Sequence, residues 1–571
     1  MRLYFKPRLL LCTFLICLSI IIYSCSSVSV EKLYDNGVVA TSSPIASQVG
    51  LDILESGGNA FDAAIAVGFA LAVTHPQAGN IGGGGFALLK RAGVDNIEAL
   101  DFREMAPLGA TRDMYLDING DPIENKSILG AASSGVPGTV AGLFEIWKRY
   151  GSLDWFDLVQ PAMVLADSGF IVTEYLANSI MEYRKDLSFF PETEKLFFKN
   201  GQPVKSGELL IQKDLARTLD RIGRDSTDGF YAGETAELIV SSMQKNNGLI
   251  SAKDLSNYHP IWRRPVQFEF DKYMIYSMPP PSSGGVILGE ILKMIESYDF
   301  ELYSPNSPEY IHLFAEACRL AYADRAVHLG DPDFVNNPVD ELLSDNYITA
   351  RSSLINPDAA GNSEEIGSGI SEKNILPESE STTHFCIVDK DHNIVSLTYT
   401  LNASYGSKLV VDGAGFLLNN EMDDFSVKPG IPNIYGLVGG EANEIVPGKR
   451  MLSSMSPTII MKNDRPVMAL GSPGGSKIIT TVAEAIINFI RFDMTASKIA
   501  GFPRFHHQWL PDTLYLEQGG FDLNTIQALI SKGHRVKERS KYSDLQIIFI
   551  NDNGLISGAS DPRENGKTLG Y

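Results

Sequence analysis

Two adjacent threonines, Thr382 and Thr383, stand where a polar segment ends and an apolar segment begins. The segment before them, ESES, is acidic and rich in serine, whereas the segment after them, HFCIVD, has the composition of a β-strand. A threonine hydroxyl is a poor nucleophile unless a base lies beside it, and a threonine at a chain terminus carries its own base, the free α-amine. Because that amine has a reference pKa of about 8, a small shift lets it act at neutral pH. The junction therefore suggests a nucleophile at Thr382, provided that the chain is cut in front of it.

The chain itself could make this cut. The Thr382 hydroxyl would attack the carbonyl of Ser381, and water would open the resulting ester to leave Thr382 as a new N-terminus. The alternative interpretation is structural, because β-branched residues such as threonine are favoured at the start of a strand. The two threonines alone do not decide between these interpretations.

A β-hairpin after the junction would place a second hydroxyl beside Thr382. In FCIVDKDHNIVSLTYTL two strand-like runs flank a polar turn. If the pairing is symmetric about Asp391, Thr382 lies opposite Thr400. The sequence therefore predicts that these two hydroxyls are neighbours.

Helical and strand-like segments alternate on both sides of the junction. Helices are expected over 59–73 and 313–330, the second one stopped by glycine. After the junction, strands are expected in HFCIVD, NIVSLTYTL, PTIIMK and PVMALGS, followed by a helix in TTVAEAIINFIRF. The stretch over about 355–381 is rich in Gly, Ser, Glu and Asn, which predicts a flexible linker. We expect one layered α/β body that an exposed loop interrupts.

The composition of the 571-residue chain excludes some classes of partner. It is 44% apolar and 20% charged, which is ordinary for a globular protein with a sizeable core. Its formal net charge of −21 argues against attraction to nucleic acid or to an anionic membrane surface.

The N-terminus has the pattern of an export signal over residues 1–25. Three basic residues, Arg2, Lys6 and Arg8, precede an apolar run over 9–22 that is short for a membrane span. The following Ser24–Cys25 resembles a bacterial lipoprotein signal, in which the cysteine is lipidated. Export to the periplasm or cell envelope, with a lipid anchor on Cys25, is therefore expected, and ordinary secretion or an uncleaved anchor stays open.

No cofactor or metal site is indicated. The glycine-rich segments over 79–89 and 471–477 lack the flanking elements or the residues that nucleotide-binding motifs require. The nine histidines show no ligand spacing, and only Cys318 and Cys386 lie outside the signal. Those two cysteines are expected to be buried thiols, with a single disulfide as the alternative.

Seven short motifs resemble those of γ-glutamyltranspeptidases in their order and spacing: LDFREMAP, GNIGGGGF, TTHFCIVD, TYTLN, LLNNEMDDFS, MLSSMSP and GSPGGSKI. The resemblance covers nearly all of the chain after the signal. It implies an N-terminal-nucleophile hydrolase with an αββα sandwich, in which two central sheets lie between helical layers. It also implies a precursor that cuts itself into a large subunit, residues 26–381, and a small catalytic subunit, residues 382–571, which stay together as a heterodimer.

The resemblance assigns four residues to the chemistry. Thr382 matches the nucleophile, and Thr400 matches the threonine that hydrogen-bonds to it. Gly474 and Gly475 match the residues whose N–H groups stabilise the oxyanion, where glycine permits a close approach.

Other residues match those that bind the γ-glutamyl group. Arg103 resembles the arginine that binds the α-carboxylate, beside the hydroxyls of Ser453 and Ser454. The groups that resemble acceptors for the α-ammonium are Asn402, Glu421 and Asp424. Tyr435 falls in the lid loop of lid-bearing bacterial members. Position 421 is a departure, because some bacterial relatives have glutamine there.

The implied activity is transfer of the γ-glutamyl group from glutathione or related γ-glutamyl compounds to water, an amino acid or a peptide, without a cofactor. One alternative is an acylase of the same architecture that cuts glutaryl or cephalosporin-type amides. The ammonium acceptors speak against it, because an acyl group without an amine leaves two carboxylates unpaired. A second alternative is a lipoprotein that binds γ-glutamyl peptides without chemistry, which has no reason to be cut at Thr382.

Overall fold

Strands from both ends of the chain pair with each other in the computed structural model, which describes residues 31–298, 302–368, 382–428, 437, 439–540 and 542–571. Residues Leu33–Tyr571 form one compact unit that contains two large antiparallel sheets. The first has seven strands in the order β20 (Lys567–Gly570), β1 (Gly37–Thr41), β11 (Thr383–Asp389), β12 (Ile394–Thr400), β2 (Gly84–Lys90), β3 (Ile97–Phe102) and β8 (Ile261–Arg263). The second has six strands in the order β19 (Ile556–Ser560), β18 (Gln546–Ile550), β14 (Arg465–Gly471), β13 (Thr458–Lys462), β10 (Tyr273–Ser277) and β9 (Val266–Phe270).

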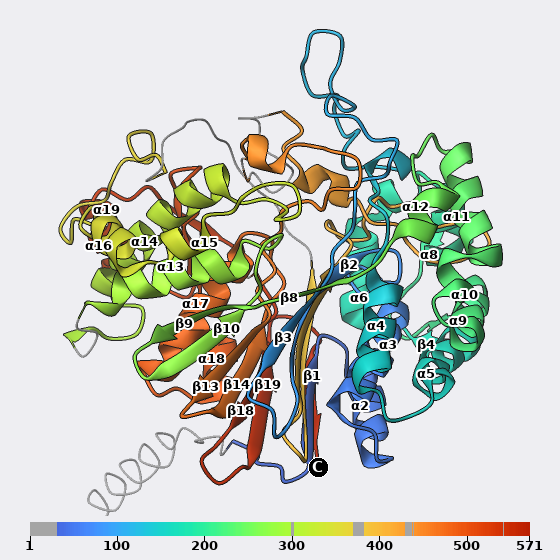
Figure 1. The fold of residues 1–571 in the computed structure, drawn as a ribbon, viewed down its shortest axis with the longest axis horizontal. Helices are drawn as coiled ribbons and strands as arrows, with labels where there is room; N and C mark the ends of the chain where they lie inside the picture. The colour runs from blue at the N-terminus through green and yellow to red at the C-terminus, as the bar shows by residue number, and fades with distance from the viewer. Residues whose placement is uncertain (1–30, 299–301, 369–381, 429–436, 438, 541) are drawn as a thin grey trace, which may run out of the picture. The chain divides into compact units, whose positions relative to one another are not determined.

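The two sheets lie face to face between helical layers (Figure 1). On the first sheet pack α2 (Pro44–Glu55), α3 (Ala60–Thr74) and α4 (Thr139–Tyr150), with α5 (Trp155–Ser168) and α9 (Lys213–Asp225) further out. On the second sheet pack α13 (Gly284–Glu296), α17 (Lys477–Ile490) and α18 (Ala496–Gly501), with α14 (Pro308–His328) against α13. This arrangement confirms the predicted αββα sandwich. Among the described helices, none combines the length and the apolar character that crossing a membrane requires.

The central hairpin is apolar because both of its faces are buried. In β11, Phe385 and Ile387 pack in the core under α3, whereas Cys386 and Val388 pack in the core that contains the second sheet. A strand buried on both faces has an almost continuous apolar sequence instead of a polar and apolar alternation. Cys386 and Cys318 are both buried free thiols, as expected.

The predicted helices are present, with shifted ends. Asn59 begins α3 through a capping box with Asp62, so the predicted segment 59–73 differs from the helix by one residue at each end. The segment predicted to start at Leu313 begins earlier, because Ser307 caps α14 and Pro308 occupies its first position.

The first part of the predicted linker is anchored, which corrects the expectation of flexibility from about residue 355. His312 donates from Nε2 to the carbonyl of Asn356 at 2.8 Å. The backbone N–H of Ser363 donates to Asp512 at 3.0 Å, and the indole of Trp509 donates to the Ser363 carbonyl at 2.9 Å. Composition alone does not show such anchoring, because the partners are far away in the sequence. The rest of the predicted linker, residues 369–381, lies outside the described residues.

The buried carboxylate of Asp389 connects the hairpin turn to helix α3. One oxygen accepts the N–H of Asp391 at 3.0 Å and that of Asn393 at 2.9 Å. The other oxygen accepts the N–H of Ala60, in the first turn of α3, at 2.9 Å. Asp389 therefore stabilises both the hairpin and the helix that covers it.

We expect Asp389→Ala to lower the free energy of unfolding by about 2–4 kcal/mol, because several N–H groups lose a charged acceptor in a buried setting. The control is Asp391→Ala, which removes an exposed carboxylate from the same turn and should change this free energy by less than about 0.5 kcal/mol. Chemical denaturation of both variants measures the difference. Equal stability of the two variants would contradict the role given to Asp389.

Candidate active site

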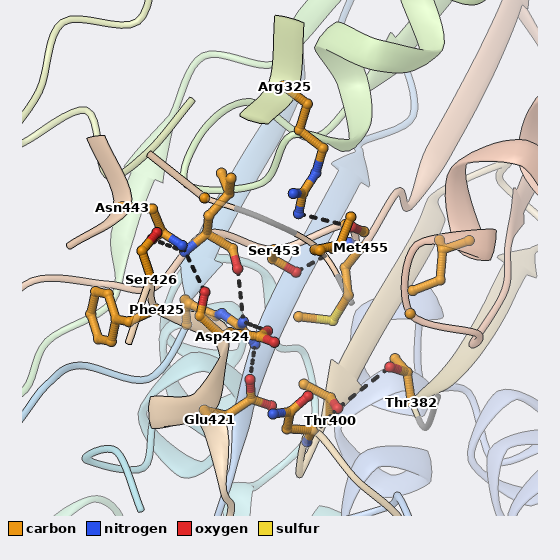
Figure 2. A pocket seen from close by; sticks show the side chains of 18 residues that line it. Arg325, Thr382, Thr400, Glu421, Asp424, Phe425, Ser426, Asn443, Ser453 and Met455 are labelled. Carbon is orange, nitrogen blue, oxygen red and sulfur yellow. Dashed lines mark hydrogen bonds and ion pairs between the residues drawn. The ribbon is translucent and has the colours of Figure 1, made fainter. Parts of the chain in front are cut away.

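The hairpin register brings Thr382 beside Thr400. Thr383 pairs with Tyr399, so the pairing is symmetric about Asp391 as predicted. The Thr382 hydroxyl donates to the Thr400 hydroxyl at 3.4 Å (Figure 2). Thr400 Oγ1 also accepts the N–H of Asn402 at 2.8 Å, which fixes the Thr400 side chain.

Four neighbouring strands bring an arginine to the same edge of the sheet. Thr400 at the end of β12 pairs with Gly84 at the start of β2, and the next residue of β2 pairs with Phe102 at the end of β3. Arg103 follows immediately. With strands spaced about 4.8 Å apart, its backbone lies about 14 Å across the sheet from Thr382. This separation leaves room for an acyl chain between the nucleophile and the guanidinium.

The buried guanidinium of Arg103 is surrounded by carboxylates. Its Nη1 lies 2.6 Å from Glu421 and 3.5 Å from Glu104, and its Nη2 lies 2.5 Å from Asp424. Its Nη2 also donates to the carbonyl of Leu452 at 3.3 Å. One cation therefore faces three carboxylates, of which Glu104 and Glu421 are buried and Asp424 is partly buried.

Burial raises the pKa of all three carboxyls, and Arg103 opposes the shift. The pKa of Glu421 is raised well above its usual range, first by burial and then by the charges of Glu104 and Asp424. Burial likewise raises the pKa of Glu104 to about 7 and raises that of Asp424. Since one guanidinium does not balance three carboxylates, the cluster favours an additional proton or a ligand cation.

A short 3-10 turn and a buried amide position these carboxylates. Glu421 and Asp424 belong to η3 (Glu421–Asp424). The side chain of Asn419, just before this turn, accepts the N–H of Glu421 at 3.0 Å and donates to the carbonyls of Gly82 and Gly135, both at 2.8 Å. This amide ties the turn to two loops of the first half of the chain.

Ser453 and Ser454 line a cavity that also contains Arg103, Glu421 and Asp424. The Ser453 carbonyl accepts the N–H of Ser283 at 2.8 Å, which joins this loop to the start of α13. Arg325, on α14, donates to the Ser454 hydroxyl at 3.2 Å and to the Ser283 hydroxyl at 2.8 Å. Figure 2 shows Arg325 reaching from its helix toward the loop that carries Ser453 and Met455. A second cation therefore holds the serine side of the cavity.

Gly474 and Gly475 have positive φ angles of 133° and 56°. A side chain at Gly474 would meet the Ser543 hydroxyl at 2.6 Å, so the position requires glycine. In the described part of the chain, neither glycine N–H donates to another backbone group. Helix α17 starts two residues later at Lys477, and its N-terminus favours negative charge. The segment can therefore stabilise an oxyanion beside Thr382.

One cavity collects most of the predicted site residues. Its lining includes Arg103, Thr382, Thr400, Asn402, Glu421, Asp424, Ser453, Ser454 and Gly475. Gly474 lines an adjoining cavity that also contains Thr382. Three predicted residues, Tyr435, Ser381 and Cys25, lie outside the described residues.

Several lining residues were missed from the sequence: Arg325, Phe425, Ser426, Leu437, Asn443, Leu452, Met455 and Ile478. Only Arg325 had a local signal, a charged residue in the predicted buried helix. Asn443 holds the site framework, because its amide donates to the Asp424 carbonyl at 2.7 Å and accepts the Leu452 N–H at 2.9 Å.

Three groups with metal-ligand chemistry also meet, at His312, Glu316 and His534, whose ligand atoms lie within 4.8 Å of one another. The histidine spacing did not reveal this group, because His534 is distant in the sequence. His312 Nδ1 and His534 Nε2 share a hydrogen bond at 2.8 Å, and Glu316 forms an ion pair with Arg319 at 3.1 Å. Burial lowers the pKa of both histidines, so they are neutral. We interpret the group as a hydrogen-bonded network.

Comparisons with known proteins place this geometry in a family. The family model described as gamma-glutamyltranspeptidase matches residues 46–571. The glutathione hydrolase proenzyme of Escherichia coli (strain K12) is 47% identical over 94% of this chain and 92% of its own length. The Helicobacter pylori gamma-glutamyltranspeptidase structure is 44% identical, with a TM-score of 0.57, over 58% of this chain and 95% of the matched chain. The cephalosporin acylase from Bacillus halodurans is 27% identical, with a TM-score of 0.82, over 96% of this chain and 98% of its own. The chain belongs to the γ-glutamyltranspeptidase family.

Proposed function

We propose that this protein is a self-processing γ-glutamyltransferase and glutathione hydrolase. The observation that carries the proposal is the shared cavity, which contains the Thr382 hydroxyl, the Arg103 guanidinium and the carboxylates of Glu421 and Asp424. A γ-glutamyl group carries an ammonium and a carboxylate at one end and the reacting carbonyl at the other. The cluster offers complementary charges for that zwitterionic end, and Thr382 and the glycine pair offer a nucleophile and oxyanion donors for the carbonyl.

The reaction has two steps. The free α-amine of Thr382 takes the proton of its own hydroxyl, and Oγ1 attacks the γ-carbonyl carbon. The carbon–nitrogen bond breaks, the leaving amine receives that proton, and a γ-glutamyl ester forms on Thr382. Water or the amine of an amino acid or peptide then attacks the ester and gives a proton to the α-amine of Thr382. The ester bond breaks, and the α-amine passes this proton to Thr382 Oγ1 as it leaves. Gly474 and Gly475 stabilise the oxyanion in both steps.

Substrate binding would rearrange the charges around Arg103. Both terminal nitrogens of the Arg103 guanidinium are already paired with carboxylates, Nη1 with Glu421 and Nη2 with Asp424. A bound γ-glutamyl group therefore requires the Arg103 ion pairs to open. The α-carboxylate of the substrate then pairs with Arg103 in place of a protein carboxylate. The substrate ammonium pairs with the released carboxylates of Glu421 and Asp424.

The charges around Arg103 also favour a γ-glutamyl substrate over the substrates of the acylase alternative. An acyl group such as glutaryl has a carboxylate but no ammonium, so it would leave Glu421 and Asp424 without a cation after displacing them from Arg103. The identity of 47% to the glutathione hydrolase proenzyme against 35% to the Acylase ACY 1 proenzyme of Pseudomonas sp. (strain V22) also favours the γ-glutamyl substrate.

The proposal includes cleavage before Thr382 and export. Both sheets contain strands from each side of that bond, for example β1 beside β11 and β10 beside β13, so the two products would stay joined as a heterodimer. The basic and apolar pattern over 1–25 supports export to the periplasm or cell envelope, with a lipid anchor on Cys25. Metabolic labelling with radioactive palmitate tests the anchor: the label should enter the wild-type protein and not a Cys25→Ala variant.

We expect Thr382→Ala to yield one uncut chain and to lower γ-glutamyl-p-nitroanilide hydrolysis by at least about 10³-fold, because both the hydroxyl and the new N-terminus are lost. The control, Thr382→Ser, keeps a hydroxyl and should still release the 190-residue piece 382–571, more slowly. Intact mass and N-terminal sequencing measure the cut. A Thr382→Ala protein that is still cut before residue 382 would contradict the proposed mechanism.

Asp424→Asn should lower kcat/KM for γ-glutamyl-p-nitroanilide by about 10²–10³-fold, because it removes a partly buried charge that pairs with the substrate ammonium. The same variant should change kcat/KM for glutaryl-p-nitroanilide by less than about tenfold, because that substrate has no ammonium. Asp423→Asn, in the same turn but outside the cavity lining, is the control. Equal losses on the two substrates would argue for the acylase alternative.

The pH dependence of kcat/KM should reflect the raised carboxyl pKa values. Glu421 binds the ammonium only when ionised, so kcat/KM should rise with pH through its acidic limb. Because the charge of Glu104 raises the pKa of Glu421, Glu104→Gln should move this limb to lower pH. Rate profiles with γ-glutamyl-p-nitroanilide, with the exposed Glu124→Gln as control, measure the shift. A limb that stays in place or moves to higher pH would contradict this electrostatic account.

A further inference from the structure

Two buried charged residues, Asp101 and Arg450, contact the main chain of Arg103. Asp101 lies on β3 and is 0% exposed, and Arg450 is 3% exposed. Neither is among the described residues that line the cavity of Arg103 and Thr382. Because charges are costly to bury, their place beside Arg103 calls for an explanation from their contacts.

The main chain of Arg103 is held at both of its polar atoms. Its N–H donates to Asp101 Oδ1 at 2.9 Å. Its carbonyl accepts a hydrogen bond from the hydroxyl of Tyr258 at 2.9 Å and another from Nε of Arg450 at 3.4 Å. The backbone position of Arg103 is therefore closely defined.

The residues that follow Arg450 hold the side chain of Arg103. Nε of Arg103 donates to the carbonyl of Met451 at 3.3 Å, and Nη2 donates to the carbonyl of Leu452 at 3.3 Å. Neither acceptor belongs to a carboxylate that substrate binding would displace. These two bonds can therefore keep the guanidinium in place while its ion pairs open.

Arg450 is fixed in turn by partners from distant segments. Its Nε lies 3.5 Å from Asp101 Oδ1, and its Nη2 donates to the carbonyl of His259 at 2.7 Å. Its backbone N–H donates to Asp331, which follows α14, at 2.8 Å. The second oxygen of Asp101 accepts from Nε of Arg263, on β8, at 2.7 Å. The network therefore joins the edge of the first sheet to the segment after α14.

We propose that Asp101 and Arg450 are positioning residues, which hold Arg103 in the orientation that binds the α-carboxylate of the substrate and so set the preference for acyl groups that carry it. The inference rests on the function proposed above. A guanidinium binds a carboxylate best through two parallel hydrogen bonds, which require the two planes to align. Loss of this alignment should weaken α-carboxylate binding and leave Thr382 and the glycine pair in place, because those groups belong to other segments.

The test uses two substrates that differ in the α-carboxylate alone, γ-glutamyl-p-nitroanilide and 4-aminobutyryl-p-nitroanilide. Both contain the ammonium, the acyl chain and the leaving group, so the ratio of their kcat/KM values reports what the α-carboxylate contributes. We expect Arg450→Met to lower this ratio by about tenfold or more, because a small misplacement of a binding group costs up to about 10²-fold in rate. Release of p-nitroaniline by the self-processed proteins measures both values.

The ratio is taken within each variant, so a loss of folded or self-processed enzyme cancels. Arg450→Lys keeps a positive charge beside Asp101 and should recover part of the ratio. Arg264→Met makes the same chemical change at an exposed position next to Arg263, and should keep the wild-type ratio. Arg450→Met should also raise KM for the γ-glutamyl substrate more than it lowers kcat, whereas a loss of folded enzyme lowers kcat alone.

Two results with Arg450→Met would overturn the proposal: an equal loss of kcat/KM on both substrates, or a ratio that stays at the wild-type value. A wild-type ratio near one, or a wild-type protein that hydrolyses neither glutathione nor γ-glutamyl-p-nitroanilide, would instead refute the proposed function itself.

Discussion

The antiparallel pairing of β11 with β12 is the constraint on which the site depends. Its register sets Thr382 opposite Thr400, and the next two strands of the sheet carry the same edge across to Arg103. A shift of one residue would turn every side chain of the hairpin to the other face. Since both faces are buried in apolar cores, such a shift is strongly disfavoured. The stability of the two cores therefore fixes the position of the nucleophile.

The second constraint is the shortage of positive charge around Arg103. Two buried carboxylates, Glu104 and Glu421, and the partly buried Asp424 share this guanidinium, and burial raises the pKa of each of them. Such a cluster contributes little to the stability of the fold, because attraction to the guanidinium offsets only part of the free energy that removing the charges from water costs. Its retention in the interior fits a binding role, in which a ligand supplies the missing cation and accepts Arg103 with its own carboxylate.

The order of strands explains how one chain could be cut beside its active site and stay assembled. Both sheets contain strands from before and from after residue 381, so neither piece has a complete sheet alone. The segment over 356–363 is also held by Asp512 and Trp509 from the other side of the bond. Cleavage would therefore free a terminus without separating the layers, which a nucleophile that uses its own α-amine requires.

The sequence by itself determined the local structure and the chemical types. The hairpin register follows from the apolar runs around Asp391, and helix α3 from its apolar segment. The proposed roles of Thr382, Arg103 and Asp424 come from motifs that resemble a known family. Only the tertiary structure decided which distant groups share a cavity. Arg325 meets Ser454, and Gln77 meets Glu564 across one cavity, because the packing of layers joins segments hundreds of residues apart. The pKa shifts could not be predicted from the sequence either, because burial and the proximity of other charges depend on that packing and not on periodicity along the chain.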